Sequence, residues 1–210
     1  MGRKMNVLIQ RVYLQSKNMR FLFIIPLIGY YVVIPILFHV MQRNLVMELN
    51  PVARLSEVCY STVPIIAVLW NLFQLRTQIE GESGEVLASY SKMGIQVFVF
   101  YLMNCFCFLP VFLLSEDSEG MLMALFLQML IISFLLNGMV FFLAFALKSI
   151  SITVLIVFMY HLFATRFEEF FLELRYGMMK GNPLWQQQGM TLFVAGLFFW
   201  LLGVRSSKRF

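Results

Sequence analysis

Histidine and cysteine side chains are the first candidates for chemistry here, because they are common ligands of transition metals. The two histidines, His39 and His161, are far apart in the sequence, and neither has an H-E-x-x-H spacing or a third ligand nearby. Cys105 and Cys107 are two positions apart, so on a helix their side chains would point about 200° apart. We therefore predict no metal site, with hydrogen-bonded histidines and with all three cysteines, Cys59 included, as packing residues.

A glutamate pair, Glu168 and Glu169, is the second candidate, because paired carboxylates can perform acid–base catalysis. Membrane proteases of the CAAX-processing type carry such a pair with an arginine four residues after its second member, where this chain has Glu173. Arg175 follows two residues too late, and no serine lies in a G-x-S-x-G setting that would mark a nucleophile. The sequence therefore does not predict an enzyme.

Among the segments that the topology rules place in the cytoplasm, the longest polar interruption between membrane-length apolar stretches runs from Arg76 to Lys92. Its three glutamates surround two glycines and lead into a short apolar run, so a charged rim adjoins an apolar anchor. We predict a cytoplasmic handle for a partner protein at 76–92, and a solvated acidic loop is the simpler alternative. The residues expected to contact the partner are Glu80, Glu82, Gly84, Glu85, Val86, Leu87 and Tyr90.

Polar side chains also occur inside one apolar stretch, 121–147, and just after it. On a helical wheel Ser133, Asn137 and Lys148 lie within roughly 60° of one another, joined by Ala144. We expect this face to be buried in protein, where polar groups find partners. Ser133 and Asn137 would then either line a substrate route or make a contact between helices.

The elements that must position these residues are membrane helices. A chain of 210 residues with 60% apolar residues, 23 Phe and 13% charged residues would have an apolar surface as a soluble domain. A helix of about 20 apolar residues crosses a hydrocarbon core of roughly 30 Å. The sequence predicts an all-α integral membrane protein, one domain over 1–210, with six transmembrane helices near 21–41, 58–75, 95–114, 121–147, 150–165 and 190–204.

Basic residues set the expected orientation, because Lys and Arg are enriched at the cytoplasmic ends of spans. Six spans with both termini in the cytoplasm place most basic residues and only the three loop glutamates on that side. The basic residues on that side are Arg3, Lys4, Arg11, Lys17, Arg20, Arg76, Lys92, Lys148, Arg205, Lys208 and Arg209. The net charge of +5 then reflects topology and contact with anionic lipid, and no nucleic-acid partner is expected.

Two segments outside the spans have amphipathic patterns. Residues 3–20 place apolar side chains at helical spacing opposite basic ones, which predicts an interfacial helix on the inner leaflet; an ordinary basic flank is the alternative. Residues 166–189 interleave aromatic and acidic side chains up to Gly177, and Trp185 could anchor at headgroup depth. We expect an external amphipathic segment there, with a solvated loop as the alternative.

The complete arrangement resembles the permease subunits of ATP-binding-cassette transporters of the type-2 exporter class. The resemblance covers the layout of six spans, a basic N-terminal helix, an acidic loop after the second span and an external element before the sixth. In motif it is limited to the loop, where Glu82-Ser83-Gly84-Glu85-Val86-Leu87 is similar to the coupling helix of that class. It departs from the commoner form, which has threonine after the glycine and glutamate one position later.

The resemblance implies that this chain binds no cofactor and that ATP and Mg²⁺ belong to a separate ATPase; the chain itself contains no Walker A motif. Two ATPase copies would join two permease subunits, as a homodimer or a heterodimer, in a bacterial cytoplasmic membrane. The cargo would be amphipathic or hydrophobic: a peptide, a drug or a lipid. The alternative is a non-transporting membrane protein, either an intramembrane enzyme or a structural or assembly subunit.

Overall fold

The structure is a computed structural model, and it describes residues 13–14, 17, 19–44, 51–80, 93–114, 121–166 and 184–208. Within these ranges every element is helical, which confirms the all-α prediction for this part of the chain. Five helical stretches are long and apolar enough to cross a membrane, so the chain is a multi-pass membrane protein. They are Phe21–Met41, Leu55–Ile79, Met93–Phe112, Leu122–Leu147 and Gly189–Ser207.

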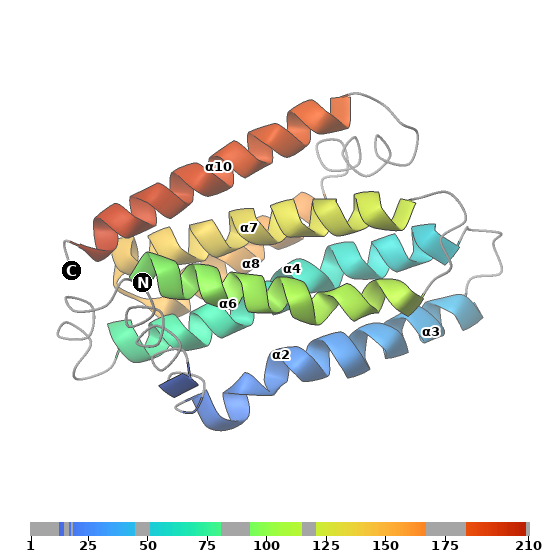
Figure 1. Ribbon diagram of the computed structural model, residues 1–210, viewed down its shortest axis with the longest axis horizontal. Helices are drawn as coiled ribbons and strands as arrows, with labels where there is room; N and C mark the ends of the chain where they lie inside the picture. Colours follow the sequence, from blue (N-terminus) through green and yellow to red (C-terminus); the bar gives the residue numbers. More distant parts are fainter. Residues whose placement is uncertain are drawn as a thin grey trace, which may run out of the picture.

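The predicted span at 150–165 corresponds to α8, Ile150–Arg166. Its apolar part, Ile150–Ala164, is shorter than the other five stretches and shorter than the roughly 20 residues that a hydrocarbon core requires. In Figure 1 this helix runs back along α7, Met121–Leu147, in the opposite direction. Five spans are therefore shown by length and hydropathy, and the sixth predicted segment is a helix of borderline length.

The first membrane segment is not a uniform α-helix. It begins as a 3₁₀ turn, η1 (Arg20–Phe23), continues as α2 (Ile25–Ile28), widens into a π-helix, η2 (Gly29–Val33), and ends as α3 (Ile34–Asn44). Proline lacks a backbone N–H, and the two prolines of this segment lie on either side of the π-helix, in α2 and in α3. The segment packs closely on α4, because a Cβ added at Gly29 would come within 2.8 Å of Ile66.

Two helices occupy the middle of the bundle, α4 (Pro51–Ile79) and α7. Figure 1 shows α2 and α3 along α4 on one side, and α10 (Leu184–Ser207) along α7 on the other. Between them lies α6 (Met93–Phe108), which continues as the 3₁₀ helix η3 (Leu109–Leu114). Because consecutive helices alternate in direction, Glu80, Met93 and Ile150 all lie at the end of the bundle where α10 terminates.

The contact between α7 and α10 depends on glycine. A Cβ at Gly138 of α7 would lie 2.7 Å from the carbonyl oxygen of Gly196 in α10, and one at Gly196 would lie 3.1 Å from Cα of Leu135. The two backbones therefore touch, as small residues allow in membrane helix pairs. Gly189 and Gly203 stand seven residues before and after Gly196, so all three lie on one helical face.

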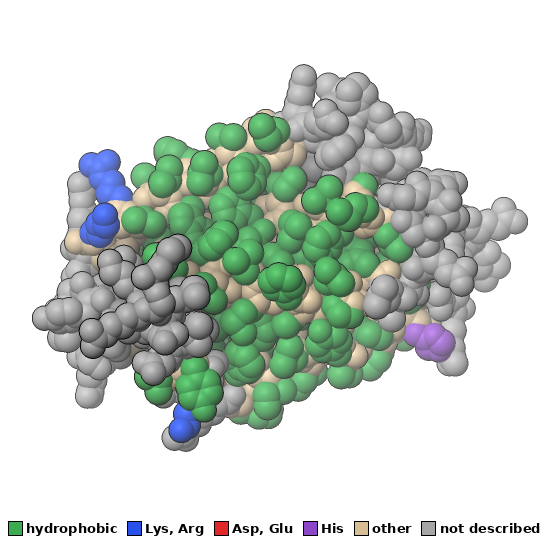
Figure 2. Space-filling view, in the orientation of Figure 1, with side chains coloured by type: hydrophobic (Ala, Val, Ile, Leu, Met, Phe, Trp, Pro, Cys, Tyr) green, Lys and Arg blue, Asp and Glu red, His purple; other side chains and the backbone are tan. Residues whose placement is uncertain are grey.

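The outside of the bundle is apolar over most of its length. Figure 2 shows hydrophobic side chains covering the face between the two ends, with Lys and Arg at one end. Outward side chains such as Phe106 and Phe198 are 74% and 58% exposed, which suits contact with acyl chains rather than water. Among the residues whose side chains are described, the exposed cations are Lys17, Arg76, Lys148, Arg205 and Lys208.

Three predicted features lie wholly or largely outside the described residues. These are most of the interfacial helix at 3–20, the loop residues 81–92, and residues 167–183 of the external segment. Parts of the last two predicted segments do belong to helices. Residues 76–79 form the last turn of α4, and residues 184–189 form the first turns of α10.

Candidate functional site

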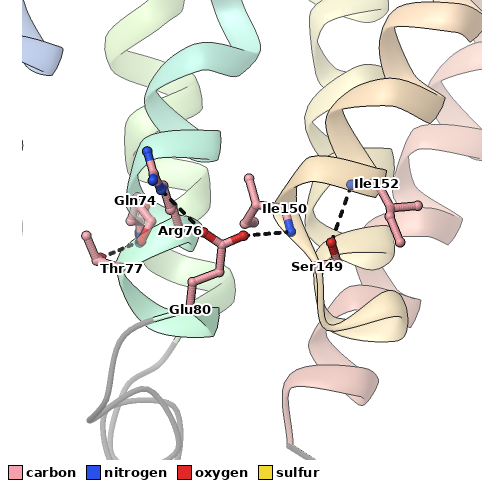
Figure 3. A network of polar contacts seen from close by, with 7 residues as sticks. All are labelled: Gln74, Arg76, Thr77, Glu80, Ser149, Ile150 and Ile152. Carbon is pink, nitrogen blue, oxygen red and sulfur yellow. Dashed lines mark hydrogen bonds and ion pairs between the residues drawn. The ribbon is translucent and has the colours of Figure 1, made fainter.

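The residue that begins the predicted partner-binding loop joins two helices. Glu80 follows directly on α4, and its Oε2 accepts a hydrogen bond from Nε of Arg76 at 3.3 Å. Its Oε1 accepts from the backbone N–H of Ile150, also at 3.3 Å, at the start of α8 (Figure 3). A carboxylate there satisfies one of the N–H groups that the first turn of a helix leaves without an intrahelical partner. Both oxygens of Glu80 are therefore engaged within the chain.

The beginning of α8 is shaped by its own polar residues as well. Lys148, with φ of 51°, turns the chain between α7 and α8 in the left-handed region. The Ser149 hydroxyl then accepts from the N–H of Ile152 at 3.4 Å, which caps the helix in the usual manner of serine. Figure 3 shows Glu80 and Ser149 on the two sides of this helix start. The junction therefore fixes the position where α4 ends relative to the position where α8 begins.

A second polar site lies inside the bundle, along one face of α4. Asn71, Gln74 and Gln78 recur at helical spacing, and their side chains are 0%, 0% and 3% exposed. The carbonyl oxygen of Ala67 continues the same face, one turn before Asn71. We call these four positions the amide face of α4. It meets α6 and α7.

Two asparagines from neighbouring helices share the Ala67 end of this face. Nδ2 of Asn104 on α6 donates to the Ala67 carbonyl oxygen at 2.9 Å, and Nδ2 of Asn137 on α7 donates to the same oxygen at 3.3 Å. Oδ1 of Asn104 also accepts from the Tyr30 hydroxyl at 3.2 Å, and Oδ1 of Asn137 accepts from Nδ2 of Asn71. Four membrane segments are thus joined through uncharged groups.

Some amide oxygens of this face have no hydrogen-bond partner among the described residues. Gln74 and Gln78 both donate to Oε1 of Gln96 on α6, at 3.3 and 3.5 Å. Within the described part of the chain, Oδ1 of Asn71 and Oε1 of Gln74 and Gln78 have no hydrogen-bond partner. An unpaired buried polar group costs about 1–3 kcal/mol. These oxygens would accept hydrogen bonds from O–H or N–H groups.

The predicted residues on α7 belong to this second site. Ser133 and Asn137 are both 0% exposed, and Asn137 makes contacts to α4 while its Nδ2 also bonds the Ser133 carbonyl at 2.8 Å. The Ser133 hydroxyl has no partner among the described residues. Lys148 departs from the expected face, because it lies after the end of α7 and its side chain is exposed. A left-handed turn carries it away from the helical register.

Of the residues predicted to contact the partner, only Glu80 is described. Glu82, Gly84, Glu85, Val86, Leu87 and Tyr90 lie outside the described residues. The hydrogen-bond partners of Asn137 on α4, Ala67 and Asn71, were not predicted. Asn71, Gln74 and Gln78 carried a signal, because their spacing places three amides on one face of an apolar helix. α4 holds three buried side-chain amides, at Asn71, Gln74 and Gln78, and α7 holds two, at Gln128 and Asn137.

His161 and the three cysteines lie buried or partly buried in the bundle, and His39 is exposed. His161 is 5% exposed, and its Nε2 lies 3.2 Å from the carbonyl oxygen of Ser61. Cys59 and Cys105 are buried, and Cys107 is partly buried; none forms a disulfide. No group of three potential metal ligands comes together among the described residues.

In comparisons with known proteins, the chain matches no family model, no curated protein and no solved structure. The two sites must therefore be interpreted from their own geometry. One joins the ends of two helices at the base of an acidic loop, and the other crosslinks membrane segments through uncharged amides.

Proposed function

We propose that this chain is the transmembrane subunit of an ATP-driven exporter of the type-2 class, and that its acidic loop docks on a separate ATPase. The observation that carries the proposal is the position of Glu80. A force applied to the loop at 81–92 reaches α4 through the chain itself and reaches α8 through the bond from Ile150 to Glu80. A partner bound to the loop could therefore move two helices together.

The amide face supports a moving rather than a static role. Its unpaired oxygens on Asn71, Gln74 and Gln78 are costly in a dry interior, so an arrangement that brings polar groups to them would be stabilised. Transport by alternating access requires two such arrangements of nearly equal free energy. The side chains of this face are all uncharged, which suits an amphipathic peptide, drug or lipid better than a small ion.

In this proposal α8 crosses the membrane as a sixth span, and both termini are cytoplasmic. Its apolar part ends at Ala164, and the residues that follow it would extend the helix to the opposite interface. The complex would contain two permease chains, alike or different, and two ATPase subunits that bind ATP and Mg²⁺. It would lie in the cytoplasmic membrane of a bacterium.

Copurification tests the docking step. A tagged chain purified from its native membrane should bring with it an ATPase that carries a Walker A motif. Glu82→Lys with Glu85→Lys should abolish this association, because the charge reversal would repel the basic surface that the loop is expected to meet. Glu116→Lys with Glu119→Lys, on the side that the charge distribution places outside, is the matched control and should retain the ATPase.

Glu80→Ala tests the junction in the same preparation. The ATPase should remain attached through Glu82 and Glu85, because both oxygens of Glu80 are engaged within the chain rather than by the partner. Transport for each ATP hydrolysed should fall, because the loop would be tied to α4 alone. Unchanged association after the double loop substitution would contradict the docking role. Normal transport in Glu80→Ala would instead show that the tie to α8 is not needed, and would leave docking intact.

A further inference from the structure

A groove of about 520 Å³ lies between α4 and α8 at the end of the bundle where exposed cations are found. Its walls are apolar: Leu69 and Phe73 come from α4, and Val154 and Phe158 come from α8. All four side chains are partly exposed, so the groove is accessible from outside the bundle. Its volume falls within the usual range for small-ligand sites, roughly 300–1,000 Å³.

The polar end of the groove presents hydrogen-bond donors. Arg76 lines it with a side chain that is 65% exposed. Of the N–H groups of this side chain, only the one on Nε donates to Glu80. The Glu80 carboxylate lines the groove too, but its two oxygens already accept from Arg76 and from the N–H of Ile150. What remains for a ligand is the outer edge of the guanidinium and the exposed Ser151. Such a surface complements the oxygens of a phosphate.

One end of the groove is polar and the rest is apolar, as in a phospholipid molecule. Arg76 and Ser151 lie near the helix ends, and the apolar walls continue toward the middle of the bundle. From Arg76 back to Leu69, and from Ser151 on to Phe158, each wall extends seven residues, or about 10 Å along a helix. A headgroup at the guanidinium would therefore place the first part of an acyl chain against Phe73 and Val154.

We propose that this groove binds one phospholipid through its phosphate, taken from the leaflet at the basic end of the bundle. A free anion would contact Arg76 and leave the apolar walls without an apolar ligand. A lipid without a phosphate would fill the walls and leave the outer edge of the Arg76 guanidinium without a ligand. A phospholipid satisfies both parts of the groove.

The test measures lipid binding to the purified full-length chain in detergent. Native mass spectrometry and thermal stability are followed during titration with phosphatidylglycerol, diacylglycerol or inorganic phosphate. Phosphatidylglycerol should bind and raise the melting temperature more than diacylglycerol does, and phosphate alone should have no effect. Arg76→Gln should weaken phosphatidylglycerol binding about fivefold, as expected for one cation near an anionic lipid.

The control is Arg205→Gln, which removes an exposed cation on α10, a helix that does not line the groove. It should leave phosphatidylglycerol binding unchanged. Val154→Phe keeps every charge and fills the apolar part of the groove, so it should also weaken phosphatidylglycerol binding. It replaces Arg76→Gln as the test variant if Arg76→Gln does not fold. Equal losses in Arg76→Gln and Arg205→Gln, equal responses to the two lipids, or a full response to phosphate would each overturn the proposal.

Discussion

At the scale of single residues, the bundle depends on asparagine side chains that satisfy several partners at once. Asn104 is the clearest case, because its amide contacts the Ala67 carbonyl oxygen, the Phe100 carbonyl oxygen at 3.0 Å, and the Tyr30 hydroxyl. It therefore connects the first membrane segment, α4 and α6. In a membrane the alternative to such a contact is an unsatisfied group among apolar side chains.

Asn104→Leu should lower the free energy of unfolding by about 1–3 kcal/mol, because it leaves the buried Tyr30 hydroxyl without its partner. Tyr30→Phe combined with Asn104→Leu should cost less than the sum of the two single changes, since the orphaned group is then absent. Unfolding by denaturing detergent measures both. Phe106→Leu, at a site 74% exposed on the same helix, is the control. If the effects of Tyr30→Phe and Asn104→Leu were strictly additive, the contact between these two side chains would be contradicted.

The sequence indicated only part of this network. Ser133 and Asn137 stood out because they interrupt the most apolar stretch of the chain. Asn104 did not stand out, because its partners on other helices are far away in the sequence. They are the Ala67 carbonyl oxygen, 37 residues away, and the Tyr30 hydroxyl, 74 residues away. Helical spacing shows which residues share a face, but it does not show which face of another helix will meet them.

At the scale of elements, the backbones of α7 and α10 approach each other closely at Gly138 and Gly196. Large aromatic rings flank this contact: Phe134 stacks on Phe193 and on Trp200, with ring centroids 5.3 and 5.7 Å apart. Close backbone approach and ring packing replace the hydrophobic effect, which does not drive association between helices already in lipid. Small side chains along this contact between α7 and α10, the α7–α10 seam, are thus a structural requirement.

Gly138→Ala should destabilise the protein by about 1–3 kcal/mol, because the new Cβ would lie 2.7 Å from a backbone oxygen that has little freedom to move. Gly189→Ala is the matched control on the same seam. Its Cβ would meet Ile131 at 3.5 Å, an ordinary contact, so the better helix propensity of alanine should make this change neutral or stabilising. Thermal unfolding in detergent compares them; equal effects would contradict the close seam.

Hydropathy predicted the elements well where the helix and the apolar stretch coincide. The segment predicted at 121–147 matches α7, Met121–Leu147. The segment predicted at 58–75 is too short, because α4 begins at Pro51 and ends at Ile79, beyond the predicted boundaries at both ends. The helix continues through polar residues such as Arg54 and Arg76, which lie outside those predicted boundaries. The π-helix at Gly29–Val33 leaves no hydropathy signal at all.

At the scale of the whole molecule, the helices alternate in direction, and exposed cations among the described side chains gather at one end of the bundle. The exposed cations of the described side chains include Arg76, Lys148, Arg205 and Lys208, which belong to the end where α4, α7 and α10 terminate. His39, near the end of α3, lies at the opposite end. This asymmetry is the physical basis for the expected orientation, with the cation-rich end in the cytoplasm.

Vesicles of known orientation test this expectation. A membrane-impermeant maleimide should label Lys208→Cys only in inside-out vesicles and His39→Cys only in right-side-out vesicles, because both positions are exposed at opposite ends of the bundle. The unsubstituted chain, whose three cysteines lie within helices, gives the background signal. Labelling of both variants from one side would contradict the bundle as a membrane-crossing unit, and exchanged sides would reverse the orientation.

The amide face of α4 has a further consequence, which concerns membrane voltage. Moving one elementary charge across a membrane is worth about 2.3 kcal/mol per 100 mV. Asn71, Gln74, Gln78, Asn104 and Asn137 carry no formal charge, so a membrane potential does almost no work when these side chains change neighbours. Helices that slide along this face would do so at nearly the same rate in energised and de-energised cells.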